Sequence, residues 1–414
     1  MRAWLVQTGE PVPLSSDVKR MRTALLADEL SSRGHDVVWW ASRFDHGSKR
    51  FVSASESPCR MDSGAELRLL PALGYRHNLS LRRYRDHVYV ARRFRRAISA
   101  DPNPPDLVVA ATPDYHIASV AAEHARSLGI PYVIDVRDPW PDSFVDHAPG
   151  AIAKALARGL LAHDFAKVRR MLRGSAGIVA MMESMLDWGL AHAGRPRGER
   201  DRVFYLGTEP LPAPDPDFLG HLRGLGFGKR PVLVYVGTFG RYNHPGVIIE
   251  ALRIMGERGD RAFDVVIGGA GDLFDALRNR AEGLERVHFT GWLRSEQIAA
   301  VLALGSLGVV PWTQGDAFPN KAFSYLAAGL PMVTSAGGDL RTILEGERIG
   351  AFFPPGDALA LADRLTKMIA EQSELDAMRF RIAALYPLHF EASGIYRAFA
   401  DHLEALQRVG RTEA

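Results

Sequence analysis

The sequence predicts an α/β protein built from two doubly wound, Rossmann-like domains, on the basis of three observations. Its 414 residues are too many for one ordinary domain and suit two domains of about 150 to 200 residues each. Short apolar runs alternate with helical patterns along the chain, which is typical of parallel sheets with helices on both faces. Three prolines within residues 211–217 predict a linker between two such series, because proline fixes φ and removes a backbone donor.

The N-terminal series is expected to form a first domain over residues 1–210. The apolar run at the amino terminus is short and leads directly into a turn, so we expect a buried strand there and not a signal peptide. The expected strands lie at residues 3–6, 37–40, 107–111 and 132–136, and the expected helices at 19–33 and 117–128.

The C-terminal series is expected to form a second domain over residues 211–395. Its expected strands lie at residues 232–236, 265–267, 287–290, 307–310 and 332–334, with a helix near 247–258. Residues 396–414 are expected to form a last helix that packs back on the first domain. Open parallel sheets bind ligands beyond the carboxyl ends of their strands, and two facing sheets would form a cleft. The loops after these strands are therefore where a site is expected.

The composition narrows the class of protein further. With 47% hydrophobic and 24% charged residues the chain is globular, without extended disorder. Its single cysteine, Cys59, forms no internal disulfide and belongs to no metal-binding pattern, which favours a reducing, cytoplasmic location and no metal. No window approaches the roughly 20 apolar residues that span a bilayer.

The most specific segment spans residues 315–333 and follows the strand expected to end at Val310. Phe318, Pro319 and Asn320 lead into a helix that we expect to open at Lys321. A helix amino terminus carries unpaired N–H groups and partial positive charge, so it favours a diphosphate, and Lys321 adds a point charge there. The alternative interpretation is an ordinary buried helix with a charged cap.

This segment reads P-N-K-A-F-S-Y-L-A-A-G-L-P-M-V and resembles the signature P-x-K-x-x-E-Y-L-A-A-G-x-P-V of the retaining glycosyltransferases of family 4, especially the bacterial cell-surface polysaccharide branch. The resemblance covers most of the chain, closely over residues 230–350. It implies the GT-B fold, in which two Rossmann-like domains face each other across a cleft and the C-terminal one binds a nucleotide-sugar donor.

The same resemblance assigns two positions that are acidic in the family and separated by seven residues. The first contacts the donor sugar and corresponds to Asp316, and the second contacts the nucleotide ribose and corresponds to Ser324. Ser324 departs from the family, because a hydroxyl binds a ribose without the charge assistance of a carboxylate.

Glycines and a basic residue follow the other C-terminal strands. Gly237 and Gly240 would let the backbone approach a phosphate closely, and Arg241 matches the family's cation for the leaving diphosphate. A second family cation has no counterpart here except His244. Taken alone, such a loop is more often a simple turn. Three further donor contacts are predicted after the next two strands, at Gly269, Gly271 and Trp292, although plain packing is an equal alternative for Trp292.

In the first domain, two loops at strand ends carry candidate residues. Gly9 is predicted to lie near the donor diphosphate and Glu10 near the acceptor. Arg137 occupies the place of a catalytic-site histidine in many relatives and is assigned to the acceptor side, whereas Asp138 is assigned to catalysis. A structural ion pair is the alternative for this acid and arginine.

Two basic stretches suggest a surface for anionic lipid. Residues 76–96 contain eight arginines and one acid, Asp86, with apolar residues every three or four positions, which predicts a basic amphipathic helix. Residues 151–173 repeat the pattern. A solvated helix face is the equal alternative, and nucleic-acid binding is not expected because no binding module accompanies the arginines.

The predicted function is hexosyl transfer, with retention, from a nucleoside-diphosphate sugar to a hydroxyl of a lipid-linked saccharide. Arg241 and Lys321 would stabilise the leaving diphosphate without a metal, and Asp316 and Asp138 complete the predicted catalytic set. The alternatives are an epimerase or hydrolase of the same shape, or a non-catalytic nucleotide-sugar-binding protein. The expected location is the cytoplasm, with peripheral attachment to the inner face of the plasma membrane.

Overall fold

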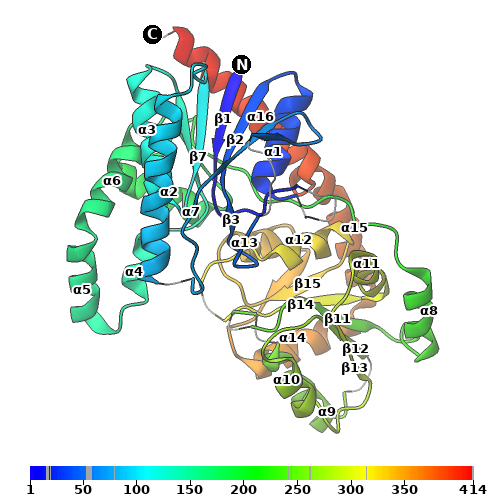
Figure 1. Ribbon diagram of the computed structural model, residues 1–414. Coiled ribbons are helices and arrows are strands. Elements are labelled where there is room, and N and C mark those ends of the chain that lie inside the picture. Colours follow the sequence, from blue (N-terminus) through cyan, green and yellow to red (C-terminus); the bar gives the residue numbers. More distant parts are fainter. Residues whose placement is uncertain are drawn as a thin grey trace. The chain divides into compact units, whose positions relative to one another are not determined.

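The structure is a computed structural model that describes residues 1–14, 18, 20–52, 58–78, 80–240, 242–243, 245–260, 263–313 and 315–412. The chain divides into two compact units (Figure 1). Unit 1 comprises Met1–Leu206 and Ile395–Ala414, and unit 2 comprises Gly207–Gly394.

Unit 1 is organised around a sheet of eight strands in the order β10-β9-β8-β7-β1-β2-β6-β5. The strands are β1 (Arg2–Val6), β2 (Asp36–Ser42), β5 (Cys59–Arg60), β6 (Glu66–Leu70), β7 (Leu107–Ala111), β8 (Tyr132–Val136), β9 (Gly177–Ala180) and β10 (Arg202–Val203). All pairs are parallel except β5 with β6. A separate antiparallel pair joins β3 (Phe44–Asp45) and β4 (Arg50–Phe51). The strand order reverses between β1 and β7, which makes that junction the switch point of unit 1.

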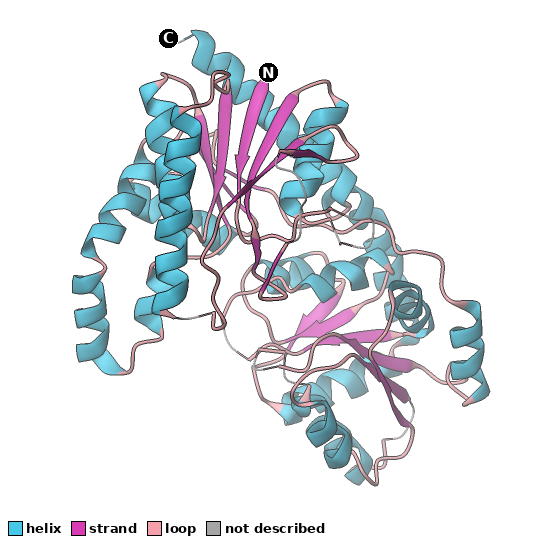
Figure 2. Ribbon diagram, viewed as in Figure 1, coloured by secondary structure: helices cyan, strands magenta, loops and turns pink. Residues whose placement is uncertain are grey.

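Helices flank the strands of unit 1 on both sides (Figure 2). They are α1 (Arg22–Ser32), α2 (Leu81–Ser99), α3 (Tyr115–Ser127), α4 (Asp142–Asp146), α5 (Gly150–Leu160), α6 (Ala162–Arg173), α7 (Glu183–Ala193) and most of α16 (Ala392–Thr412). Two starts have side-chain caps, because Ser80 accepts a hydrogen bond from Arg83 N and Asp114 from Ile117 N. The basic stretch at 151–173 is two helices, α5 and α6, which meet at Leu161.

Unit 2 contains six parallel strands in the order β13-β12-β11-β14-β15-β16. They are β11 (Val232–Val236), β12 (Asp264–Gly268), β13 (Val287–Gly291), β14 (Leu307–Val310), β15 (Met332–Thr334) and β16 (Gly350–Phe352). The helices are α8 (Pro216–Gly224), α9 (Gly246–Glu257), α10 (Phe274–Arg280), α11 (Ser295–Leu304), α12 (Asn320–Ala327), α13 (Asp339–Gly346), α14 (Ala358–Ala370) and α15 (Gln372–His389). The strand order reverses between β11 and β14, so the loops after these two strands frame the switch point of unit 2.

Two expectations about local structure need correction. The proline-rich segment 211–217 is not linker throughout, because Pro216 is the first residue of α8 and Asp215 caps that helix by accepting from Phe218 N. The amphipathic helix α2 is not free on its apolar side. Its residues Ala91, Phe94 and Ile98 are buried in the core of unit 1.

Candidate functional site

Lys321 lies at the switch point of unit 2, in the first turn of α12. Its Nζ donates hydrogen bonds to Asn243 Oδ1 at 2.9 Å and to Tyr235 Oη at 3.1 Å, and it lies 4.3 Å from the centre of the Tyr235 ring. Burial lowers the pKa of this amine from its ordinary 10.5 to about 7. Among the described residues, no carboxylate lies within ion-pair distance of Lys321. A partly buried cation with neutral partners at a helix amino terminus is suited to bind an anion.

Three of the predicted glycines hold the neighbouring loops close together. A Cβ added at Gly237 would lie 2.8 Å from Lys321 Cε, so this glycine makes room for the lysine. A Cβ at Gly269 would lie 1.8 Å from the carbonyl oxygen of Gly237, and one at Gly271 would lie 2.3 Å from that of Phe239. Both of these glycines have positive φ values, 132° and 150°, that favour glycine. The close approach of neighbouring backbone leaves no room for a side chain at Gly269 and Gly271, which explains why these positions are glycine. Contact of the three glycines with a donor stays a prediction.

The two positions assigned by the family spacing differ in exposure. Asp316 is exposed and pairs with Gly337 in an isolated parallel bridge, and a Cβ at Gly338 would lie 2.9 Å from its Cγ. Ser324 is partly buried on α12, three residues after Lys321, so both side chains share one side of the helix. The carboxylate is therefore open to a ligand, and the hydroxyl lies on the same helical side as the lysine.

The residues before α12 support the start of the helix. Pro319 is the N-cap and has extended backbone angles, and Asn320 is the first helical residue, one position before the expected start. Phe318 is buried and stacks on Phe323 with ring centres 4.2 Å apart. Its ring thus anchors the helix, and contacts of these three residues with a donor stay predictions.

Aromatic residues lie at the carboxyl ends of the unit 2 strands. Trp292 follows β13 and is 76% exposed, so plain packing does not account for it. Sequence reasoning missed the pair Tyr242 and Trp312, whose rings stack 5.7 Å apart and join the loops after β11 and β14. An aromatic residue two positions after a buried strand was the available signal. Arg241 and His244 lie outside the described residues, so the role of Arg241 stays a prediction. A Cβ added at Gly240 would meet no atom within 4 Å, so packing does not require a glycine there.

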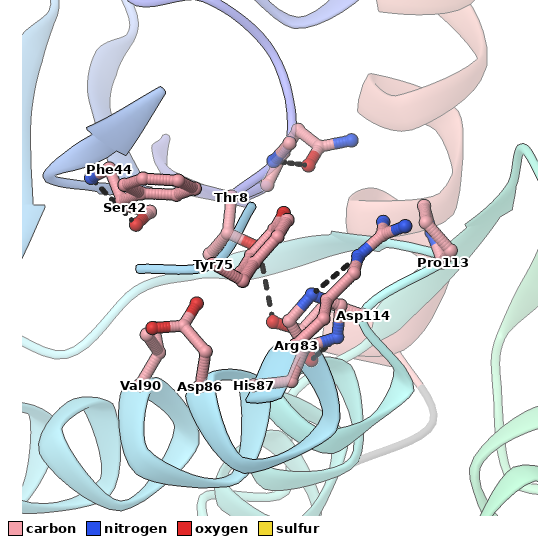
Figure 3. Close-up of a pocket in the computed structure, with 12 residues that line it drawn as sticks. Thr8, Ser42, Phe44, Tyr75, Arg83, Asp86, His87, Val90, Pro113 and Asp114 are labelled. Atoms are coloured by element: carbon pink, nitrogen blue, oxygen red, sulfur yellow. Dashed lines mark hydrogen bonds and ion pairs between the residues drawn. The ribbon is translucent and has the colours of Figure 1, made fainter. Parts of the chain in front are cut away.

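The switch point of unit 1 holds a small polar cavity (Figure 3). It has room for about 10 Å³, close to the volume that one water needs. Thr8 Oγ1 donates to Asp114 Oδ2 at 3.1 Å, and Arg83 Nε donates to His87 Nε2 at 3.4 Å. Burial raises the pKa of Asp114 and lowers that of His87 to about 3. Sequence reasoning missed this cluster, since it treated Arg83 as one of the surface arginines; the guanidinium is buried, 4.2 Å from the centre of the Trp140 ring.

Glu10 and Arg137 belong to a buried ion network next to this cavity. Arg137 forms an ion pair with Glu10 and donates to Asp135 Oδ2 at 2.8 Å, and Arg22 donates two bonds of 2.9 Å to the same carboxylate. Burial alone would raise the pKa of Asp135, but the charges of Arg22 and Arg137 hold it below its ordinary value. Glu10 also accepts from Thr23 N at 2.8 Å, at the start of α1. Glu10 and Arg137 are thus engaged with each other, and a role for either toward an acceptor stays a prediction.

The remaining two candidates of unit 1 lie in the same loops. Gly9 N donates to Gln7 Oε1 at 2.5 Å, and Gly9 lines the small cavity. Asp138 is exposed after β8, and its carbonyl oxygen accepts from Thr112 Oγ1 at 3.2 Å. In the described ranges, no three His, Cys, Asp or Glu side chains are grouped as metal ligands. None of the described helices is long and apolar enough to cross a bilayer.

Comparison with known proteins identifies both units. Residues 230–371 match the family model described as Glycosyl transferases group 1, and residues 20–207 match the Glycosyl transferase 4-like domain. A phosphatidyl-myo-inositol mannosyltransferase of Mycobacterium leprae is 31% identical over 150 residues, which are 35% of this chain and 38% of the relative. The amylovoran biosynthesis glycosyltransferase AmsK of Erwinia amylovora is 31% identical over 169 residues, 39% of this chain and 41% of the relative. The chain therefore aligns with about two fifths of the length of these relatives.

A solved structure extends the similarity to the whole fold. The crystal structure of Anabaena HepE in complex with UDP superposes with a TM-score of 0.67 at 16% sequence identity, covering 98% of this chain and 99% of that one. Two family models in succession, and a structural match over both units, agree with each other. The chain belongs to the family 4 glycosyltransferases of the GT-B fold.

Proposed function

We propose that this protein transfers a sugar, with retention, from a nucleoside-diphosphate sugar to a hydroxyl of a lipid-linked saccharide during polysaccharide or glycolipid assembly. The observation that carries the proposal is Lys321, a partly buried amine with neutral partners at the amino terminus of α12. The names of the two curated relatives support an acceptor that belongs to glycolipid or polysaccharide assembly, and the UDP bound to HepE supports a uridine nucleotide as donor.

The residues of unit 2 suit the departure of a diphosphate. As the bond between the anomeric carbon and the diphosphate oxygen breaks, negative charge grows on the leaving group, and stabilising it at that moment accelerates the reaction. Lys321 and the free N–H groups of α12 supply positive charge at this place without a metal, and Arg241 is proposed to add a second cation. Asp316 is proposed to contact the donor sugar and Ser324 the ribose.

Unit 1 is proposed to hold the acceptor, whose hydroxyl oxygen forms the new bond to the anomeric carbon and whose proton passes to the departing diphosphate. We place the reaction at the cytoplasmic face of the membrane, where a lipid-linked acceptor would lie. The exposed arginines of α2 support this location, because anionic lipid attracts basic side chains.

The test is a transfer assay with labelled UDP-sugars and GDP-sugars and a bacterial lipid extract. Label in the lipid fraction with release of the nucleoside diphosphate is the expected result. Label found only in free sugar would instead establish a hydrolase, label in a changed nucleotide sugar an epimerase, and binding without turnover a non-catalytic protein. Lys321→Ala should remove the transfer, and Lys367→Ala, an exposed lysine on α14, should retain it.

A further inference from the structure

Helix α5 differs from its neighbours in unit 1 because none of its 11 residues is buried. Three large aliphatic side chains, Ile152, Leu156 and Leu160, are 80%, 65% and 85% exposed. Residues four apart lie above one another on a helix, so these side chains form one row, which we call the aliphatic row. An isolated exposed leucine is ordinary in a folded protein, whereas a row of three on one helix indicates an interaction surface.

The face of α5 opposite the aliphatic row lies against α4. Lys154 lies 4.0 Å from Asp146 at the end of α4, and the charge of Arg158 helps to lower the pKa of Asp142 at the start of α4. At 100° per residue these two basic positions lie about half a turn around the helix from the aliphatic row. The aliphatic row therefore points away from α4.

The segment that carries the aliphatic row is free of acidic residues and is followed by a basic helix. No acidic residue occurs between Asp146 and Asp164. On the next helix, α6, three exposed arginines, Arg169, Arg170 and Arg173, line one shallow hollow of about 300 Å³. In the part of the chain that the structure describes, none of these three forms an ion pair. Figure 1 shows α5 and α6 following each other along one edge of unit 1.

This combination fits a bilayer better than a second protein. A stable protein interface needs about 20 to 30 residues on each side, far more than one short helix offers. An interfacial helix needs only an aliphatic face and basic residues for anionic headgroups. The comparison with α2 supports the choice, because α2 exposes arginines but buries Ala91, Phe94 and Ile98 in the core of unit 1 and leaves only Leu81, at its start, as an exposed large aliphatic residue.

We propose that α5 inserts its aliphatic row into the headgroup and acyl boundary of an anionic bilayer, with Arg169, Arg170 and Arg173 on the lipid phosphates. The inference rests on the membrane location proposed above and names the element that enters the lipid. Compared with the sequence expectation for residues 76–96, the proposal leaves charge to α2 and assigns the apolar face to α5.

The first experiment is co-sedimentation of the full chain with vesicles of phosphatidylglycerol and phosphatidylcholine, and with phosphatidylcholine alone. The triple variant Ile152→Ser, Leu156→Ser, Leu160→Ser should bind anionic vesicles at least tenfold more weakly, with its melting temperature unchanged because these side chains lack core contacts. The matched control Leu225→Ser, Leu359→Ser, Leu388→Ser replaces three exposed leucines of unit 2 and should bind like the wild type. Equal binding of both triple variants would overturn the proposal.

The second experiment reports insertion directly. Cys59 is the only cysteine, so Cys59→Ser combined with Leu156→Cys gives one site for a polarity-sensitive dye. The dye emission should shift to the blue with anionic vesicles. A label that stays in water on sedimented protein would overturn insertion while leaving membrane binding by the arginines intact. Failure of the wild type to sediment with any vesicle would overturn both insertion and membrane binding. A wild type that binds vesicles but transfers no sugar to a soluble acceptor would count against the proposed reaction alone.

Discussion

The ion network beside the switch point of unit 1 and the lysine at the switch point of unit 2 use charge in opposite ways. In the ion network beside the switch point of unit 1, the charges are matched, since Asp135 lies between Arg22 and Arg137, and Arg137 also pairs with Glu10. Between β11 and β14, the described part of the chain gives Lys321 only neutral partners. Removing one member of a matched set leaves an unpaired buried charge and destabilises the fold, whereas a partly buried cation without a counterion indicates a site for a ligand. The same kind of strand edge therefore builds structure in unit 1 and a binding site in unit 2.

The largest expected effect is on the stability of unit 1. Asp135→Ala would leave Arg22 and Arg137 buried without their shared carboxylate and should lower the free energy of unfolding by about 3 to 5 kcal/mol. Asp36→Ala is the control, because its pair with Arg2 is more exposed and is expected to contribute at most about 1 kcal/mol. Urea denaturation measures both. Similar losses in the two variants would contradict a structural role for the matched set.

The next effect is on catalysis in unit 2. Lys321→Ala should reduce turnover by about 100-fold, or roughly 2.7 kcal/mol of transition-state stabilisation, without a loss of stability. The same reduction is predicted for Arg241→Ala, which depends on the family resemblance. Steady-state kinetics and thermal melting check both, with Lys367→Ala as the matched lysine control. A destabilised Lys321→Ala protein with normal turnover would make Lys321 structural, like Asp135.

A smaller effect concerns pH. Because the folded-state pKa of Lys321 is about 7, the amine is partly neutral above that pH, and an anionic ligand favours its charged form. UDP affinity should therefore fall as pH rises from 7 to 9, by up to tenfold per unit, with proton uptake on binding at pH 8. Titration calorimetry in two buffers of different ionisation enthalpy measures that uptake. Lys321→Gln should abolish it, and unchanged uptake in that variant would assign the proton to another group.

The same pKa determines the sign of a stability effect. In the unfolded chain the lysine has its ordinary pKa of 10.5, so between about pH 7 and 10 the unfolded state binds more protons than the folded state. The cost of burying the charged amine is complete below pH 7 and disappears as pH rises through this window. The stability advantage of Lys321→Gln over the wild type should accordingly be larger at pH 6 than at pH 9.

The smallest expected effect tests the departure from the family pattern. Ser324→Glu should tighten donor binding a few-fold, roughly 1 kcal/mol, because a carboxylate forms charge-assisted hydrogen bonds to a ribose hydroxyl. Ser324→Gln has a similar shape without the charge and should not tighten binding. If both variants bind UDP like the wild type, the ribose does not lie at this position.

Local patterns in the sequence were sufficient to predict the bounds of the strands near the sites. The buried runs of β7, β8, β11, β14 and β15 have the same bounds in the structure as expected, because each is a short, mainly apolar run flanked by polar or turn residues. The bounds of α3 differ by a few residues from those expected, since capping by Asp114 depends on backbone geometry as well as residue type. Helix α8, which Asp215 caps, begins within the segment that was expected to be a linker.

Burial of individual side chains depends on partners that are distant in the sequence. Arg83 looked like a surface arginine, but Tyr75 and Trp140 enclose it. Glu10 meets Arg137 across 127 positions. The aliphatic row of α5 has the spacing of a core-facing stripe, and only the fold shows that no core covers it.

The most direct test of the central claim, that the unmatched Lys321 site of unit 2 receives a nucleoside diphosphate, is thermal melting with UDP and GDP. At 100 times its dissociation constant, a ligand should add about 2.7 kcal/mol to the free energy of unfolding, or about 5 to 10 °C for a unit of this size. The account predicts this shift for wild type and Lys367→Ala, and little or none for Lys321→Ala. A folded wild-type protein whose melting temperature does not move with either nucleotide at millimolar concentration would contradict it.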